Sequence, residues 1–376
     1  MASIYIHIPF CKKKCSYCDF YSVADPTLMD TYIDALCKEI DLFRKHNAPK
    51  EIDTVYIGGG TPSLLKHNHL ESIIAKITTN FNLSDSIEWT IECNPGTVSK
   101  SDFEVYLSLG INRLSIGIQS LNDDELKFLG RIHDSKLAEQ TIKDAQSAGF
   151  KNISCDLMFA IPNQTAKSWQ NTLDGILKYD LQHISAYSLI YEDGTPLTSK
   201  LNSGKINRKS AAFDYKLYEI GFTKLVAAGY RHYEISNYAK PSFKSKHNMN
   251  YWIFGDYYGF GASAHSYYNQ NRFANISSIK KYIDLVNSDK LPIETIEVIN
   301  RAESLMEQIF LSLRATGLDM GTLPKTTVDA EAKIRNYISI LIKNGYAIFE
   351  DNRLNLTSKG FFLTDEISVK LDSMLD

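Results

Sequence analysis

The sequence predicts an α/β protein with a parallel sheet, followed by a smaller α+β domain. The first observation is an alternation of short β-rich runs with longer helix-period runs from residue 3 to about 235. Alternation of this kind predicts parallel strands joined by right-handed crossovers, with ligands at the strands' carboxyl ends. The second is a return to helical period from about residue 300, ending in two short β-like runs. The third is length, because 376 residues allow one large domain and a smaller one.

Six runs rich in β-branched and aromatic residues predict the strands of the sheet. They cover residues 3–9, 52–58, 87–93, 112–119, 152–159 and 183–190. Helical patterns lie near 27–45, 66–80, 101–109, 135–148, 166–178 and 208–228, and a further strand is predicted at 230–235. Six βα units suit an incomplete barrel, although periodicity alone does not separate a barrel from an open doubly wound sheet.

The rest of the chain divides into two segments. Residues 237–299 begin with a stretch rich in Tyr, Asn and Gly that shows little helical period. Residues 300–376 resemble a winged-helix-type domain, with helical runs at 302–314 and 330–343, β-like runs around a hairpin turn at 350–352, and a closing amphipathic run at 359–374. We therefore expect domains at 1–236, 237–299 and 300–376.

Composition excludes some classes of function. A net charge of −3 and a pI near 6.3 give no global attraction to nucleic acid or to anionic membranes. The predicted helix at 330–343 carries only Lys333, Arg335 and Lys343 as cations, so we expect no nucleic-acid partner. No secretion signal precedes the first predicted strand, and a cytoplasmic location is expected.

Three closely spaced cysteines, Cys11, Cys15 and Cys18, follow the first predicted strand. Three thiolates are one fewer than the four that complete a [4Fe–4S] cluster, so one iron would stay open to an outside ligand. Structural zinc is the main alternative, but it needs four protein ligands, usually as two pairs, and no second pair follows. A disulfide would leave one cysteine over. The spacing therefore favours an iron–sulfur cluster.

A run of glycines, Gly58-Gly59-Gly60-Thr61-Pro62, follows the second predicted strand. Successive glycines let the backbone approach a ligand closely. The run is not a P-loop, because no Gly-Lys-Ser/Thr follows, and Ser63 stands where a dinucleotide fingerprint needs its last glycine. Taken alone, it predicts a tight strand-to-helix turn.

Together these motifs resemble the radical S-adenosylmethionine (SAM) superfamily, whose signature is C-x3-C-x2-C with an aromatic, here Tyr17, before the last cysteine. The order of the motifs resembles the coproporphyrinogen-oxidase-like branch, and they are Tyr5 to Cys11, Gly58 to Pro62, Glu92 to Pro95, Ser115 to Ser120, Leu129 to His133 and Asp156 to Met158. The resemblance implies a partial (β/α)6 barrel with a [4Fe–4S] cluster and SAM at its open iron.

The resemblance also assigns residues to the cofactor. SAM binding falls on Tyr5, Tyr17, Gly59, Gly60, Thr61, Glu92, Gln119, Arg131 and Asp156. Their chemistry suits SAM. Glu92 can accept from the ammonium, Arg131 can pair with the carboxylate, and the others offer polar groups to the ribose and methionine.

A second motif, His-Asn-x-x-Tyr-Trp, places His247, Tyr251 and Trp252 within six residues. It resembles the haem-binding motif of the HemW-like haem chaperones of this branch. A neutral imidazole is a standard axial haem ligand, and Tyr251 and Trp252 offer flat surfaces to a porphyrin. From the residues alone, a packed histidine in an aromatic loop is the leading alternative. Other histidines also compete as ligands, namely His7, His133, His183, His232 and His265.

The resemblance thus implies a haem chaperone with haem as its cargo. It further implies delivery to haem proteins, including respiratory enzymes at the membrane, and dimerisation linked to the cluster or SAM. Phe20 stands where the oxidase carries a further cysteine, which argues against coproporphyrinogen decarboxylation. That oxidase activity is the main alternative, and whether the chain is an enzyme stays open. A radical SAM RNA-modifying enzyme and a SAM sensor are two further alternatives.

Overall fold

Six parallel strands form the centre of the fold in the computed structural model, which describes residues 2–324 and 327–375. They are β1 (Ala2–Ile8), β2 (Ile52–Gly59), β3 (Leu83–Cys93), β4 (Arg113–Gln119), β5 (Ile153–Phe159) and β6 (His183–Ser188). Each is hydrogen-bonded to the next in that order. All six strands predicted from the β-rich runs are confirmed.

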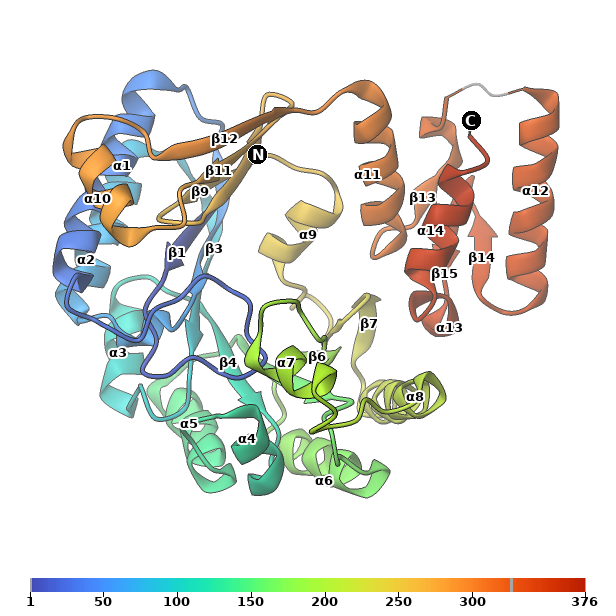
Figure 1. Cartoon of the computed structure of the whole chain (residues 1–376), viewed down its shortest axis with the longest axis horizontal. Helices are drawn as coiled ribbons and strands as arrows, with labels where there is room; N and C mark the ends of the chain where they lie inside the picture. The colour runs from blue at the N-terminus through green and yellow to red at the C-terminus, as the bar shows by residue number, and fades with distance from the viewer. Residues whose placement is uncertain (1, 325–326, 376) are drawn as a thin grey trace.

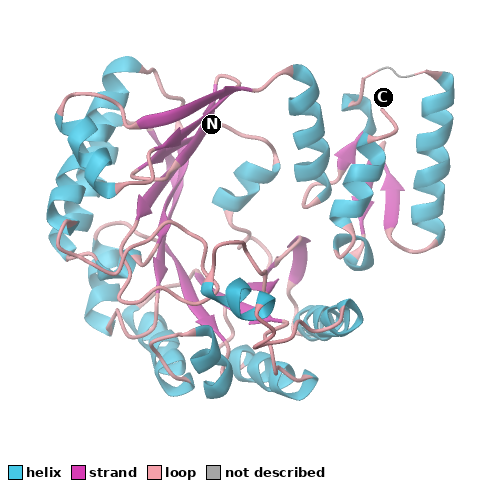
Figure 2. Cartoon of the chain, viewed as in Figure 1, coloured by secondary structure: helices cyan, strands magenta, loops and turns pink. Residues whose placement is uncertain are grey.

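Helices cover the outer face of this curved sheet, as Figures 1 and 2 show. They are α1 (Met29–His46), α2 (His67–Asn80), α3 (Lys100–Ser108), α4 (Asp123–Leu129), α5 (Ser135–Ala148), α6 (Ala166–Leu177) and α8 (Ala211–Ala227), with a short 3₁₀ turn η1 (Pro62–Leu64) before α2. The short helix α7 (Pro196–Asn202) instead lies in front of β6 in Figure 1, where the N–H of Leu197 donates to Ser16 O at 2.9 Å. Outward residues such as Ile4, Ile6 and Ile8 are fully buried in the core under these helices. The arrangement is the partial barrel that the resemblance implied. Among the helices from α1 to α8, the short α4 and α7 were not predicted.

Further strands extend the sheet at both edges. At one edge β8 (Asn237–Ala239) pairs with β6 and β7 (Arg231–Glu234) pairs with β8. At the other edge β9 (Tyr257–Phe260) runs parallel to β1, and β10 (His265–Tyr268), β11 (Asn271–Asn275) and β12 (Ile293–Val298) follow antiparallel. Helix α10 (Ile279–Asn287) packs beside α1. The strands within residues 237–299 thus belong to the same sheet as β1 to β6. The domain boundaries at 236/237 and 299/300 stay predictions.

Inside the barrel, side chains form three rows, because alternate residues of each strand point to the same face. The lower row, at the amino ends of the strands, holds Ser3, Thr54 and Glu88. The middle row holds Tyr5, Tyr56, Thr90 and Arg113. The upper row, toward the carboxyl ends, holds His7, Gly58, Glu92 and Ser115.

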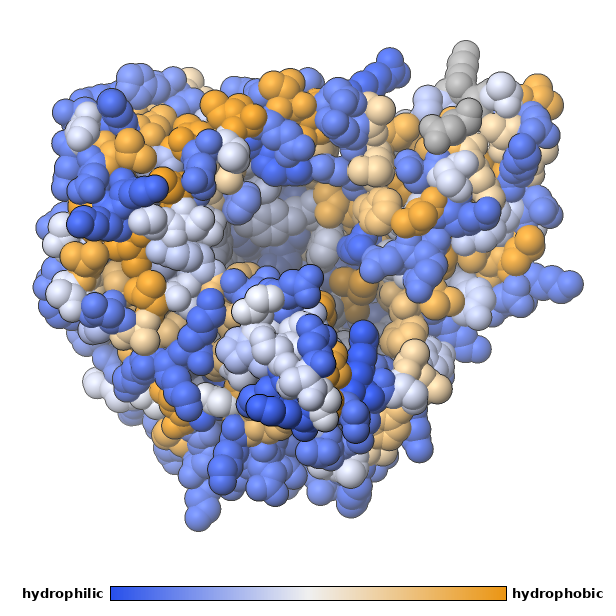
Figure 3. Space-filling model, in the orientation of Figure 1, coloured by the Kyte–Doolittle hydropathy of each residue, from blue (hydrophilic) through white to orange (hydrophobic). Residues whose placement is uncertain are grey.

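Helix α9 (Lys246–Trp252) lies against the lower row. The Glu88 carboxylate accepts hydrogen bonds from the backbone N–H groups of Lys246, at 3.2 Å, and of His247, at 3.1 Å. A carboxylate at a helix N-terminus is favourable because the helix dipole is positive there. Figure 3 shows a hollow at the centre of this face, at the position of α9 in Figure 1. The sequence did not predict this helix.

The C-terminal part of the chain has its own apolar core. Its elements are α11 (Arg301–Leu313), β13 (Leu318–Asp319), the 3₁₀ turn η2 (Met320–Thr322), α12 (Val328–Lys343), β14 (Ala347–Glu350), β15 (Arg353–Leu356), α13 (Ser358–Phe361) and α14 (Thr364–Asp372). Asp351 and Asn352 have φ angles of 52° and 61°, the left-handed conformation of a two-residue hairpin turn. The predicted helices and hairpin are confirmed. None of the helices in the described ranges is long and apolar enough to cross a membrane.

Candidate metal centre and cofactor site

The three motif cysteines lie on the loop between β1 and α1. Cys11, Cys15 and Cys18 are each partly exposed, whereas Cys37, Cys93 and Cys155 are buried. The loop is tied to its neighbours by backbone hydrogen bonds, from Cys11 N to Val23 O at 2.9 Å and from Ser16 N to Leu129 O at 3.2 Å. The free thiols are therefore held beside the carboxyl ends of the parallel strands, where such sheets bind ligands.

Polar side chains donate to two of the three sulfurs. Thr61 Oγ1 donates to Cys11 Sγ at 3.5 Å, and Arg131 Nη1 donates to Cys15 Sγ at 3.7 Å. Asn94 joins the two donors, because its Nδ2 donates to Thr61 Oγ1 at 3.0 Å and its Oδ1 accepts from Arg131 Nη2. Hydrogen bonds to sulfur tune the reduction potential of an iron–sulfur cluster. Asn94 lies in the predicted Glu92 to Pro95 motif, but no role was predicted for its side chain.

The donor set fits a [4Fe–4S] cluster better than a single metal ion. Across residues 2–324 and 327–375, no three His, Cys, Asp or Glu side chains converge closely enough to hold one ion. Tetrahedral zinc requires such convergence. The three thiolates of a cubane cluster instead bind three different irons, so their sulfurs stay apart.

The glycine run brings β2 against the cysteine loop. Gly59 has a φ of +114°, and a Cβ there would lie 2.8 Å from the ring of His7. A Cβ on Gly60 would lie 2.7 Å from the carbonyl oxygen of Phe10 and 3.0 Å from Cys11 Sγ. Glycine is required at both positions because the backbone passes so close to its neighbours. The predicted tight turn is confirmed, and its reason is this close approach.

Glu92, at the carboxyl end of β3, is bound by the same turn. Its Oε2 accepts from the backbone N–H of Gly59 at 3.1 Å, and its Oε1 accepts from the Tyr56 hydroxyl at 2.9 Å. Burial raises the pKa of Glu92 to about 7, and the nearby Asp156 adds to the rise. A ligand ammonium at this position would favour the ionised carboxylate.

The remaining polar residues expected at SAM come from β4, from β5 and from the turn after α4. Gln119 ends β4 with a φ of +68°, which is uncommon for a non-glycine residue, and its Oε1 accepts from the Tyr187 hydroxyl at 2.8 Å. Asp156 accepts from Ser115 Oγ at 3.1 Å, and burial raises its pKa. The Nε of Arg131 is buried and meets no hydrogen-bond acceptor in the described part of the chain. This unpartnered donor and the two carboxyl groups fit a zwitterionic ligand.

The two tyrosines assigned to SAM have different surroundings. Tyr17, on the cysteine loop itself, packs in a small apolar cluster with Leu129 and Tyr187. Tyr5 lies one row deeper in the barrel, where its hydroxyl is hydrogen-bonded to His7 Nδ1 at 3.0 Å. The structure thus brings most of the expected SAM residues together at one end of the barrel.

His247 lies at the opposite end of the barrel. Its Nδ1 is 2.7 Å from Thr54 Oγ1, and its Nε2 is 3.0 Å from the Tyr251 hydroxyl. Thr54 donates its own proton to Ser3 Oγ, so it accepts from Nδ1–H and leaves the lone pair on Nε2. Burial lowers the pKa of His247 to about 3, which keeps the imidazole neutral. A neutral ring oriented through Nδ1–H is the usual state of a metal-binding histidine.

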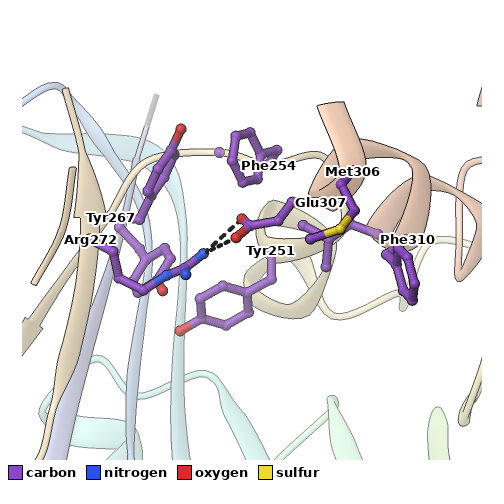
Figure 4. Close-up of a pocket in the computed structure, with 10 residues that line it drawn as sticks. Tyr251, Phe254, Tyr267, Arg272, Met306, Glu307 and Phe310 are labelled. Atoms are coloured by element: carbon purple, nitrogen blue, oxygen red, sulfur yellow. Dashed lines mark hydrogen bonds and ion pairs between the residues drawn. The ribbon is translucent and has the colours of Figure 1, made fainter. Parts of the chain in front are cut away.

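Tyr251 separates His247 from an apolar cavity. The cavity has a volume of about 390 Å³ and lies between β11 and α11. Figure 4 shows Tyr251, Phe254, Tyr267, Met306 and Phe310 around it, together with the Arg272–Glu307 ion pair at 2.6 Å. Iron could reach Nε2 of His247 only after the Tyr251 hydroxyl moves aside. The indole of Trp252 lines a different cavity, on the side of η2.

Among the described residues, three of the five competing histidines, His7, His183 and His232, make no hydrogen bond to a residue that lines the apolar cavity. Both ring nitrogens of His183 are hydrogen-bonded, to Ser154 Oγ at 2.7 Å and to the Tyr233 hydroxyl at 2.8 Å. His7 likewise uses both nitrogens. His232 is stacked on Tyr238 with ring centroids 4.3 Å apart. His247 does not line the cavity itself, but its Nε2 is hydrogen-bonded to Tyr251, which does.

Comparison with known proteins gives the following similarities. Residues 5–176 match the model of the Radical SAM superfamily. The chain is 38% identical over 320 residues to the haem chaperone HemW of Bacillus subtilis (strain 168), which covers 84% of each chain. It is 34% identical to HemW of Lactococcus lactis subsp. lactis (strain IL1403), over 98% of this chain and 96% of the relative. The solved structure of Escherichia coli coproporphyrinogen III oxidase (HemN) covers all of this chain and 90% of its own, with a TM-score of 0.85; at 22% identity it shows a shared fold.

Proposed function

The chain belongs to the HemW family of the radical SAM superfamily, and from this membership we propose that it is a haem chaperone that delivers haem to haem proteins. The family implies a [4Fe–4S] cluster and SAM, which supply one-electron chemistry when bound. Cys11, Cys15 and Cys18 would hold the cluster. Glu92 would hold the ammonium of SAM, and Arg131 would offer its free Nε to a ligand oxygen.

The observation that carries the haem assignment is the orientation of His247. Thr54 fixes its Nδ1–H, so the lone pair of Nε2 points at a single movable group, the Tyr251 hydroxyl. Tyr251 also lines an apolar cavity with aromatic walls, in which the Arg272 guanidinium is ion-paired with Glu307. A porphyrin face suits aromatic walls, and a propionate would replace Glu307 as a partner of Arg272.

A haemin titration tests this assignment. Anaerobically reconstituted wild-type protein should bind haemin and shift its Soret band, and His247→Ala should lose the axial ligation. His183→Ala is the matched control, because it removes another buried histidine with both nitrogens bonded. An unchanged spectrum in His247→Ala would place the iron ligand elsewhere.

The shared fold with the coproporphyrinogen oxidase keeps oxidative decarboxylation as a second candidate. Phe20 stands where the resemblance places a further cysteine in the oxidase, and its side chain is 62% exposed beside the cysteine loop. We therefore propose that the chain lacks this activity. Protoporphyrinogen formed from coproporphyrinogen III under anaerobic conditions, with SAM and a reductant, would contradict the proposal.

A further inference from the structure

We propose that Tyr56 couples the SAM end of the barrel to His247, so that SAM and haem change each other's affinity. This inference rests on the proposed function, since it takes Glu92 as a SAM contact and His247 as the haem ligand. Tyr56 lies in the middle row of the barrel interior. The row above it contains Glu92, and the row below it contains Thr54, which holds His247.

Tyr56 contacts one residue of each site. Its hydroxyl donates to Oε1 of Glu92 at 2.9 Å. Its ring is stacked on the imidazole of His247, with centroids 5.0 Å apart and planes 29° apart. A further stacked contact joins it to Tyr5, with centroids 6.2 Å apart. One aromatic side chain therefore bridges the two ends of the barrel.

Little free space surrounds this bridge. A Cβ on Gly58 would lie 2.9 Å from Cε1 of Tyr56 and 3.1 Å from the carboxyl carbon of Glu92. Movement of the carboxylate must therefore be passed to the tyrosine, because close-packed side chains transmit displacement. Thr54 lies two residues before Tyr56 on β2, and its hydroxyl is hydrogen-bonded to Nδ1 of His247 at 2.7 Å.

A ligand ammonium bound at Glu92 would change the hydrogen bond that the carboxylate accepts from the Tyr56 hydroxyl. The carboxylate now accepts from the Tyr56 hydroxyl and from Gly59 N–H. A cation would share these oxygens and move the preferred position of the hydroxyl and its ring. The imidazole stacked on that ring sets the direction of Nε2 toward iron. Coupling of this kind is reciprocal, and typical values change affinity about 5- to 150-fold.

Haemin affinity with and without saturating SAM tests the coupling in the full-length, anaerobically reconstituted protein. Tyr56→Phe keeps the ring and its stacking and removes only the bond to Glu92. Tyr230→Phe is the matched control, because it removes a buried hydroxyl that donates to Leu181 O at 2.6 Å, away from both sites. We expect SAM to change the haemin Kd by about fivefold or more in wild type and control, and by less than about twofold in Tyr56→Phe.

A haem-free measurement separates this inference from the proposed function. In protein with isotope-labelled histidine, SAM should shift the ring resonances of His247, assigned through His247→Gln, and the shift should vanish in Tyr56→Phe. Wild type that binds no haemin would overturn the proposed function, and the His247 resonances would still decide the coupling. If SAM changed neither the haemin Kd nor the ring resonances of His247, the coupling would be overturned and the proposed chaperone function would remain. If SAM changed the haemin Kd of Tyr56→Phe as much as that of wild type, the Tyr56 hydroxyl would not carry the coupling.

Discussion

Arg131 and Cys15 are joined by a hydrogen bond of 3.7 Å from Nη1 to Sγ, although 116 positions separate them in the chain. Through Asn94 the guanidinium is also connected to Thr61, which donates to Cys11. Two of the three motif cysteines are therefore tied together by a path of side chains that follow β2, β3 and α4. The path orients both sulfurs before any cluster is present.

Replacing Asn94 should loosen the cluster without removing a ligand. Asn94→Leu breaks the bonds to Thr61 and Arg131, and loss of a buried partner typically costs about 1–3 kcal/mol. We expect normal iron content after anaerobic reconstitution but a several-fold faster loss of cluster absorbance in air. Asn112→Ala is the control, since it also removes two hydrogen bonds, to the backbone of Ile87 and Trp89 in β3. Equal decay rates in all three proteins would contradict the role of Asn94.

The raised pKa of Glu92 predicts pH-dependent SAM binding. The ammonium needs the ionised carboxylate, whose pKa is about 7 in the folded protein. SAM affinity should therefore rise roughly tenfold from pH 5.5 to 7, a range in which an α-amino group stays protonated. Glu92→Gln should bind SAM weakly with a flat pH profile, measured by calorimetry.

In the absence of ligand, the same raised pKa of Glu92 makes the folded protein less stable as the pH rises. The folded pKa lies above the ordinary value of 4.5, so the contribution of Glu92 to stability is fully present below pH 4.5. It is lost as the pH rises toward 7. If SAM affinity instead fell over this range, Glu92 would not be the ammonium contact.

Removing the Tyr251 hydroxyl should strengthen haem binding. This hydroxyl is hydrogen-bonded to Nε2 of His247, so haem iron must displace it. A typical hydrogen bond contributes about 0.5–1.5 kcal/mol, and Tyr251→Phe should therefore lower the haemin Kd roughly 2- to 10-fold. Tyr258→Phe serves as the control, because its hydroxyl accepts from Lys50 N, away from the cavity. Weaker haemin binding in Tyr251→Phe would show that the hydroxyl contacts the haem itself.

The winged-helix-like part of the chain should not bind RNA. Two of the three cations on α12 are paired with acids of the same helix, Lys333 with Asp329 and Arg335 with Glu331. Little unpaired positive charge is left on that helix to contact phosphates. Gel-shift experiments at low salt should show no complex. Salt-dependent retention would revive the RNA-modifying alternative.

The short strands β8 to β12 were not predicted, but β1 to β7 and the long helices could be, because each carries its own period. Helix α9 could not, because its seven residues are too short to establish a helical period and partners distant in sequence fix it, above all Glu88. The cysteines and the glycine turn were recognisable from their spacing. The roles of Asn94 and Tyr56 were not, because each depends on which strand ends become neighbours.

The motif cysteines and the cavity beside Tyr251 lie at opposite ends of one barrel. A recipient protein that docks near α9 and α11 would approach a haem at His247 from the side remote from the cysteine loop. Under the proposed function, unloading would therefore not require contact with this partly exposed loop. The same separation would let a cluster stay bound while the haem leaves.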